Sequence, residues 1–181
     1  MKHCMMIPSV LGKLLLEEED GKIVRLLFER DIPANVEQSD TPTLRKAAQE
    51  LSEYFAGNRK EFDIPLNPKG TDFQKSVWNA LCTIPYGKTM SYGQVAAQIG
   101  NPKASRAVGM ANNKNPIPIL IPCHRVIGAN GKLVGYGGGI WMKQKLLELE
   151  QNSHKKNPVL IIQYRVFYCF FFFGFGVGRS S

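Results

Sequence analysis

Apolar positions recur every three or four residues in one early stretch of the chain, between Thr41 and Gly57. This spacing predicts an amphipathic helix with one buried face. Thr41 can cap the helix, Pro42 fits its first turn and Gly57 can end it. The apolar face is formed by Leu44, Ala47, Ala48, Leu51, Tyr54 and Phe55.

The residues before this helix, 11–29, carry two apolar runs on either side of Asp20-Gly21. An Asp-Gly pair between such runs is a strong hairpin signal. Two strands followed by a helix predict a small α/β domain, with an antiparallel sheet, to which we assign residues 1–66. The pattern of this domain shows no catalytic group of residues.

After a proline-rich stretch at 63–71 the pattern becomes mostly helical. Thr71 is a helix cap before Phe73, Val77 and Leu81, which follow at spacings of four. The proline-rich stretch therefore predicts a linker between two domains.

Two further short helices are predicted on either side of Gly100-Asn101-Pro102. Ser91 caps the first, and residues 104–112 form the second, which is rich in small side chains. Such a pair is typical of a helix-turn-helix, although ordinary helical cores contain similar pairs. Residues 126–139 then predict a turn-rich hairpin around Asn130-Gly131, and 140–150 a final helix. We assign residues 67–153 to this mostly α, winged-helix-like domain.

The last stretch, residues 154–181, departs from these patterns. Its twenty residues 159–178 are apolar except for Gln163 and Arg165, and such a run is long enough to span a bilayer. An arginine inside the run costs about 2.5–3.5 kcal/mol on membrane insertion. Phenylalanine and glycine, rather than leucine, dominate its end. We expect a disordered or aberrant tail, and no membrane association of the residues before it.

The composition of the chain indicates a class of binding partner and a cellular compartment. The net charge is +8 and the pI about 9.4, which suits a polyanion such as nucleic acid but also occurs in many cytosolic proteins. The four cysteines are widely spaced, unlike those of a disulfide framework or a zinc site. They are Cys4, Cys82, Cys123 and Cys169. We therefore expect reduced thiols in the cytoplasm and no metal.

One cysteine has an unusual setting, because Cys123 follows the stiff segment "NPIPILIP" and precedes His124 and Arg125. Prolines fix φ and can hold a nucleophile in one place. A thiol needs a base, yet neighbouring side chains on an extended chain point to opposite faces. We therefore expect His124 to act through a water, with Glu150 on the final helix as its orienting carboxylate. Arg125 can support either the fold or a groove surface.

The segment "IPCHRV" resembles the active-site signature of the O(6)-alkylguanine-DNA alkyltransferases, also called methylated-DNA–protein-cysteine S-methyltransferases. The resemblance extends back through "GNPKASRAVGMANNKNP", "IPYGKTMSYGQVA" and "TDFQKSVWNAL", and forward to "GYGGG". It covers residues 70–150, and in looser form the chain from its N-terminus. So long a collinear match is specific to this family.

The resemblance implies a DNA repair methyltransferase that moves an alkyl group from O(6)-alkylguanine, and as a further option O(4)-alkylthymine, onto its own cysteine. Cys123 would be the acceptor, in a single-turnover reaction without metal or organic cofactor. His124 would be its base, held by Glu150, and Asn115 would order the cysteine loop. Tyr92 would hydrogen-bond the base and assist departure of the guanine.

The resemblance also implies double-stranded DNA as the partner of a monomer. The second helix of the pair would enter the minor groove with weak sequence preference, and Arg106 would fill the space left by a flipped nucleotide. Other groove contacts would come from Lys103, Ala107, Gly109, Ala111 and Lys114. The pocket for the flipped base would be formed by Pro122, Tyr136, Gly137 and Gly138.

Two other functions fit parts of the pattern. A DNA-binding regulator would share the helix pair but would not need a thiol at position 123. A thiol hydrolase would use Cys123 and His124 on acyl substrates, with repeated turnover. Reaction with an alkylated duplex separates both from the alkyltransferase.

Overall fold

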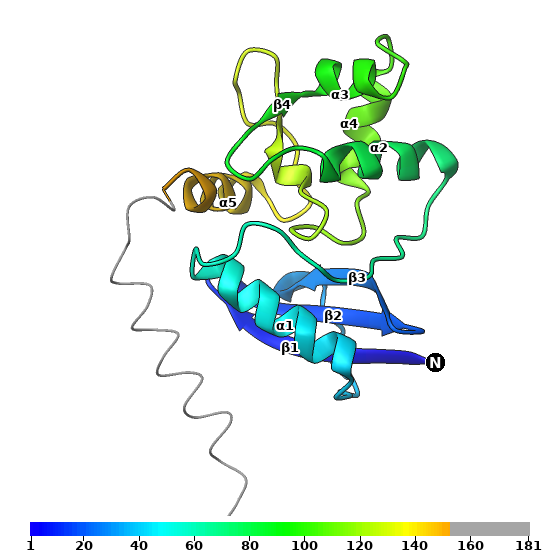
Figure 1. Ribbon diagram of the computed structural model, residues 1–181, viewed down its shortest axis with the longest axis vertical. Helices are drawn as coiled ribbons and strands as arrows, with labels where there is room; N and C mark the ends of the chain where they lie inside the picture. The colour runs from blue at the N-terminus through cyan, green and yellow to red at the C-terminus, as the bar shows by residue number, and fades with distance from the viewer. Residues whose placement is uncertain (153–181) are drawn as a thin grey trace, which may run out of the picture.

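The computed structural model describes residues 1–152, and its chain begins with a three-stranded antiparallel sheet (Figure 1). Strands β1 (Lys2–Ser9), β2 (Gly12–Glu19) and β3 (Lys22–Phe28) follow one another in sequence order. The predicted hairpin is confirmed: Asp20 and Gly21 adopt φ of 51° and 73°, as the tight turn between β2 and β3 requires. The tail prediction for residues 154–181 lies outside the described residues.

Strand β1 is an element that the sequence pattern did not predict. Its exposed and half-buried positions do not alternate regularly, and Ile7 is its one buried residue. Pairing with β2 along its whole length, from Lys2 opposite Glu19 to Ser9 opposite Gly12, defines it as a strand. The pairing partner, rather than a local period, is therefore its signal.

The predicted first helix is confirmed as α1 (Pro42–Phe55), which covers one face of the sheet in Figure 1. The Thr41 side chain accepts a hydrogen bond from the Leu44 amide, and Gly57 follows the helix with a φ of 75°. The buried face of α1 includes Leu44, Leu51 and Tyr54. Sheet and helix together form the small α/β unit that the sequence predicts.

The second half of the chain is mostly helical, as predicted. It contains α2 (Asp72–Cys82), α3 (Tyr92–Gln98), α4 (Ser105–Asn113) and α5 (Ile140–Asn152), with the 3-10 turn η2 (Cys123–Arg125) between α4 and α5. A first 3-10 turn, η1 (Glu29–Asp31), follows β3 in the N-terminal half. Thr71 and Ser91 each form a capping box, with Gln74 and Gln94 respectively. Among residues 1–152 no helix is long and apolar enough to cross a membrane.

The predicted hairpin around Asn130-Gly131 is wrong in part. The turn forms, with Gly131 at a φ of 77° and its amide bonded to the Gly128 carbonyl. However, β5 (Val126–Ile127) pairs in parallel with β4 (Met90–Ser91), and no strand lies between the turn and α5. Glycine recurs through residues 135–139, which is poor strand composition.

The two halves meet along β3. The Leu26 amide donates to the carbonyl of Pro116, at the start of the cysteine loop, and the Ile23 amide donates to Pro65 in the linker. Arg30 in η1 donates to the Gly137 carbonyl. Strand β3 and the turn η1 that follows it thus hold the beginning of the cysteine loop and the glycine-rich segment beside it. The exact domain boundaries at 66 and 153 stay a prediction.

Candidate active site

The loop that carries the cysteine is held at both ends by one side chain. Asn115 donates from Nδ2 to the Ile121 carbonyl at 2.8 Å, and its Oδ1 accepts from the Ile117 amide at 3.0 Å. Between these contacts Ile119 adopts a φ of 75°, an uncommon conformation for a β-branched residue. The amide of Asn115 therefore closes a strained loop immediately before Cys123.

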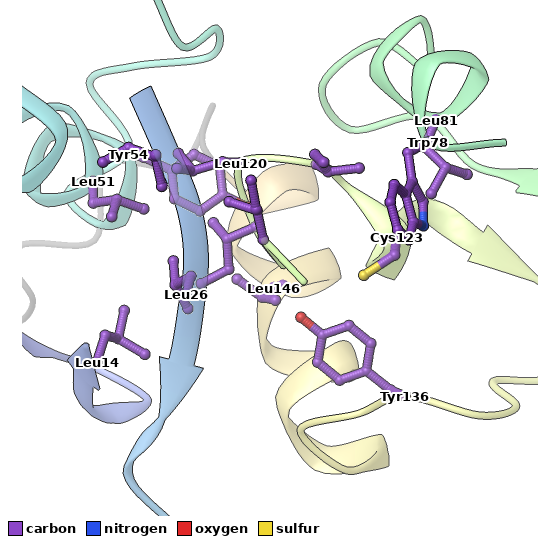
Figure 2. Close-up of a cluster of buried hydrophobic side chains, with 14 of the residues drawn as sticks. Leu14, Leu26, Leu51, Tyr54, Trp78, Leu81, Leu120, Cys123, Tyr136 and Leu146 are labelled. Atoms are coloured by element: carbon purple, nitrogen blue, oxygen red, sulfur yellow. The ribbon is translucent and has the colours of Figure 1, made fainter. Parts of the chain in front are cut away.

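Cys123 begins the turn η2 and is 3% exposed, as part of the same buried cluster as Trp78 and Tyr136 (Figure 2). Burial raises the pKa of its thiol to about 11, although a hydrogen bond with Asn115 and the positive charge of Lys143 both act to lower it. At neutral pH the resting thiol is thus protonated. A base is needed to make it nucleophilic.

His124 and Glu150 form a fully buried pair. The distance between His124 Nε2 and Glu150 Oε1 is 2.8 Å. Burial lowers the pKa of His124, while the neighbouring carboxylate acts to raise it. An ionised carboxylate only accepts, so Nε2 carries the proton and Nδ1 keeps its lone pair. Nδ1 has no hydrogen-bond partner within residues 1–152, and it is the atom available to take a proton.

The predicted geometry of Cys123 and His124 needs one change. The backbone there is a 3-10 turn, not an extended chain. Successive side chains of a 3-10 helix still point about 120° apart, since it has three residues per turn. Neighbouring side chains still diverge, so a water between the two groups stays our expectation.

Glu150 accepts hydrogen bonds from several parts of the chain. Its other donors are the Tyr54 hydroxyl at 2.8 Å, the Gly87 amide at 2.9 Å and the Arg125 guanidinium at 2.9 to 3.2 Å. Burial alone would raise the pKa of Glu150, but the bonds from His124 and Arg125 outweigh it and hold the pKa at about 2. The carboxylate is therefore charged throughout the physiological range.

Arg125 is a buried residue that bonds both Glu150 and the backbone. It is 6% exposed, and besides Glu150 it bonds the Ile84 carbonyl through Nη1 at 2.6 Å. Of the two roles that the sequence leaves open, the structure assigns it to support of the fold beneath His124. A groove contact by Arg125 is excluded by its burial.

Lys143 is a residue of this site that the sequence analysis placed on the final helix without giving it a role. It is fully buried, and its Nζ donates to the Val134 carbonyl at 2.9 Å. Burial lowers the pKa of Lys143 to about 8, opposed by the nearby Cys123. The sequence did contain a signal that Lys143 is buried. Lys143 and Glu150 are two turns apart on the helix face that also carries the apolar Leu146 and Leu147.

Tyr92 lies near Cys123, and its predicted hydrogen bond to the flipped base stays a prediction. Its hydroxyl donates to the Val134 carbonyl at 3.0 Å, the same acceptor that Lys143 uses. Burial and the proximity of Cys123 raise its pKa. Gly109 on α4 faces the Tyr92 ring, where an added Cβ would lie at an ordinary contact distance of 3.7 Å, so packing against Tyr92 does not by itself require glycine.

A cavity of about 350 Å³ opens beside Cys123, between β3 and the end of α4. Its lining includes Tyr136, Gly137, Gly138 and Lys114 of the predicted site. Figure 2 shows the Cys123 sulfur and the Tyr136 hydroxyl turned toward the same space. Gly138 leaves no room for a side chain, since an added Cβ would lie 2.6 Å from Met142 Sδ. Pro122, also predicted for the pocket, is buried just before Cys123.

A second, open groove of about 480 Å³ is lined by Tyr92, Arg106, Gly109 and Met110. Arg106 and Ala107 are exposed, as is Lys103 in the turn before α4. Ala111, by contrast, is 3% exposed, and its carbonyl accepts from the Trp78 indole. Its small side chain is buried where α4 packs on α2. A buried side chain does not contact a DNA groove, so the predicted groove contact by Ala111 is not supported.

Comparison with known proteins places this geometry in a family. The family model for the DNA-binding domain of 6-O-methylguanine DNA methyltransferases matches residues 72–152. The family model for the ribonuclease-like domain of the same proteins matches residues 2–68.

The chain belongs to the 6-O-methylguanine DNA methyltransferase family.

Similar proteins extend over most of the chain. The methylated-DNA–protein-cysteine methyltransferase of Methanosarcina acetivorans is 53% identical over 147 residues, which cover 78% of this chain and 94% of the relative. The constitutive enzyme of Bacillus subtilis is 48% identical, covering 86% and 99%. The structure of Mycobacterium tuberculosis OGT in complex with DNA superposes with a TM-score of 0.78 at 50% identity, covering 83% and 94%. The two family models and this solved relative confirm the predicted fold class.

Substitution of the central carboxylate gives the first testable prediction. Glu150→Gln should lower the free energy of unfolding at pH 7 by about 3 kcal/mol, because it leaves Arg125 buried without a charged partner. The Glu150 pKa is depressed on folding, so its contribution is present above about pH 4.5 and is lost as the pH falls toward 2. Urea titrations at pH 7 and pH 3 should show the difference between wild type and variant shrink.

A matched control is Glu148→Gln, since Glu148 is less buried on the same helix and bonds Gln144. It should change stability by less than about 0.5 kcal/mol. An equal penalty for Glu150→Gln at both pH values would contradict the assignment.

The second prediction concerns Lys143. Lys143→Met should raise the pKa of Cys123, because the nearby positive charge that favours the thiolate is removed. Alkylation of Cys123 by iodoacetamide, followed by mass spectrometry against pH, should slow by up to about tenfold for each unit of pKa change. Lys145→Met, on the exposed face of α5, should leave the pH profile in place. An unshifted profile in Lys143→Met would refute the electrostatic role.

Proposed function

We propose that this protein repairs O(6)-alkylguanine in double-stranded DNA by transferring the alkyl group to Cys123, once per molecule. The observation that supports this best is a buried thiol beside a His124–Glu150 pair whose second imidazole nitrogen has no hydrogen-bond partner among the described residues. Family membership and the relatives named for methylated DNA point to the same substrate.

DNA binding comes first in the proposed reaction. The helix pair α3–α4 presents Arg106 at the open groove beside Tyr92, and we place α4 in the minor groove of the duplex. The damaged nucleotide rotates out, Arg106 occupies its place, and the base enters the cavity beside Cys123. Damage occurs beside any neighbouring base, so phosphate contacts and shape dominate and sequence preference is weak. We propose that a monomer acts in this way in the cytoplasm.

Transfer then needs a thiolate. His124 Nδ1 takes the Cys123 proton through a water, and the charge that develops on the imidazole is balanced by Glu150. The positive charge of Lys143 also favours the thiolate. Asn115 keeps the sulfur in place, which matters because a misplacement of about 1 Å is costly to reaction rate. No metal or organic cofactor takes part in the proposal.

The bond changes balance without a further reactant. The sulfur forms a bond to the alkyl carbon as that carbon's bond to O(6) breaks, and the electron pair passes to the guanine. The guanine takes up one proton, which balances the proton that His124 removes from Cys123. Tyr92 assists by donating a hydrogen bond to the departing base, for which its hydroxyl turns from the Val134 carbonyl. The product is a thioether, which has no carbonyl for water to attack, so the thiol is not regenerated. O(4)-alkylthymine is a second substrate under this proposal.

Intact mass tests the proposed function directly. Incubation with a duplex containing O(6)-methylguanine should add one methyl group per protein, located on Cys123 by peptide mapping. Cys123→Ser should remain unmodified, because serine is a much weaker nucleophile in the same pocket. A molar excess of damaged duplex should not raise the number of methyl groups per protein molecule above one.

Two results would contradict the proposal. An unmodified Cys123 after binding of the duplex would point to a regulator that recognises damage without repairing it. Continued release of product from excess substrate would point to a hydrolase with turnover.

DNA binding gives a further prediction. Arg106→Ala should weaken binding to undamaged duplex and reduce the slope of log K against log[salt] by about one unit if Arg106 contacts a phosphate. Filter binding between 50 and 200 mM salt measures both quantities. Lys22→Ala, a charge change on the N-terminal sheet, should leave the slope unchanged. Binding that is independent of salt would contradict the proposed interface.

A further inference from the structure

Tyr54 is a side chain of the N-terminal helix α1 that reaches the pair formed by His124 and Glu150. It is fully buried, and its hydroxyl donates to Glu150 Oε1 at 2.8 Å. Oε1 is also the oxygen that lies 2.8 Å from His124 Nε2, and the Tyr54 oxygen lies 3.5 Å from that nitrogen. One carboxylate oxygen therefore accepts from a phenol and from an imidazole at the same time.

The direction of the Tyr54 hydrogen bond is fixed by the groups around it. Burial, and after it the charge of Glu150, raises the pKa of the Tyr54 hydroxyl well above its ordinary value, so the hydroxyl keeps its proton. A phenol can donate or accept, whereas an ionised carboxylate only accepts. Tyr54 thus donates to Glu150 throughout the physiological pH range.

The ring of Tyr54 is held by aromatic neighbours on several sides. Phe55 and Tyr86 lie edge-to-face with it, at ring-centre distances of 5.5 and 6.0 Å. Phe62 lies at 5.3 Å in a tilted arrangement. Such packing fixes a buried ring, so the hydroxyl is directed at Glu150 before any DNA binds.

A hydrogen bond donated to a carboxylate stabilises its charged form and lowers its affinity for a further proton. The Tyr54 hydroxyl and the His124 N–H draw on the electron density of the same oxygen. Tyr54 therefore weakens the attraction that Glu150 exerts on a positively charged imidazole. With the hydroxyl present, His124 is a weaker base than it would be with Glu150 alone.

Tyr54 carries no charge, so it acts on His124 through the carboxylate that they share. Burial lowers the pKa of His124 most, and Glu150 acts to raise it. The charges of Arg125 and Lys143 also act to lower it, and Arg125 donates to Oε1 at 2.9 Å. Titratable groups reach His124 and its hydrogen-bond partners from η2, α5, α1 and the loop before β4: Cys123, Arg125, Lys143, Glu150, Tyr54 and Tyr86.

We propose that Tyr54 is a positioning residue of the reaction, whose hydroxyl shares a carboxylate oxygen with His124 and thereby keeps the imidazole neutral until it takes up the thiol proton. This inference rests on the proposed function and gives the N-terminal helix a part in it. A neutral imidazole is needed at the start, because a protonated one cannot take the proton. Since guanine takes up one proton as it leaves, a weaker hold on the proton serves the end of the reaction as well.

Tyr54→Phe tests the proposal, because it removes the hydroxyl and keeps the packed ring. Glu150 retains its other donors, so the variant should fold, which a urea titration checks. His124 should then become charged at a pH about half a unit to one unit higher than in wild type, as expected for the loss of one hydrogen bond to the carboxylate. Single-turnover transfer of methyl to Cys123 should lose its rate on the acid side at a correspondingly higher pH.

Nuclear magnetic resonance of the unbound protein gives a readout that does not depend on the reaction. The Nε2 proton of His124 is buried and held by Glu150. In Tyr54→Phe this hydrogen bond should strengthen, and the proton resonance should move downfield. Phe55→Leu is the matched control, since it removes an aromatic contact of Tyr54 without removing a polar atom. It should lower stability and leave the resonance and the pH profile at their wild-type positions.

An unmoved resonance and pH profile in Tyr54→Phe would leave Tyr54 a packing role only and overturn the proposal. A shift of the profile toward lower pH would overturn it as well. A wild-type His124 that is charged at pH 7 would do so without any variant. A wild type that transfers no methyl group contradicts the proposed function instead, and the resonance of the unbound protein still decides the role of Tyr54.

Discussion

One buried carboxylate organises this protein. Glu150 lies in the last turns of α5 and is bonded by His124 and Arg125 from η2, by Tyr54 from α1 and by the Gly87 amide. A buried charge is tolerated only when it is paired and fully hydrogen-bonded. These donors come from both halves of the chain, so the requirement to satisfy one carboxylate fixes the N-terminal helix, the cysteine turn and the final helix against one another.

That requirement also determines the chemistry of His124. Because Glu150 accepts at Nε2, the proton sits there and Nδ1 faces away with a free lone pair. Burial keeps the ring neutral by lowering its pKa. A neutral imidazole of defined tautomer is a base, whereas a charged one is not. The cost is a resting thiol that is protonated, since the same apolar surroundings raise the pKa of Cys123 to about 11.

The sequence predicted most of what is local. The caps at Thr41, Thr71 and Ser91 are short-range hydrogen bonds, and the Asp20-Gly21 turn depends on two φ angles. Residues whose role depends on distant partners were missed. Tyr54 looks like one more apolar position of an amphipathic helix, and only the folded chain shows its hydroxyl on Glu150.

Lys143 was missed for a related reason. A lysine on a helix is ordinarily a solvated side chain, and its immediate sequence neighbours do not reveal that the fold buries it. The second strand of the hairpin predicted around Asn130-Gly131 is wrong for the opposite reason. The local turn signal was correct, but the strand after it depended on a distant partner. This strand did not form, since Val134 gives its carbonyl to Tyr92 and Lys143 instead of to a neighbouring strand.

The final helix thus carries two buried charges of opposite sign, two turns apart on one face. Glu150 sets the state of the base, and Lys143 lies close enough to Cys123 to influence the thiol. Replacement of either by an apolar residue would shift the proton balance between Cys123 and His124, and replacement of Glu150 would also leave Arg125 buried without a charged partner. Titratable groups with shifted pKa values gathered beside a nucleophile are typical of functional sites. The helix that closes the fold is therefore also the element that tunes the nucleophile.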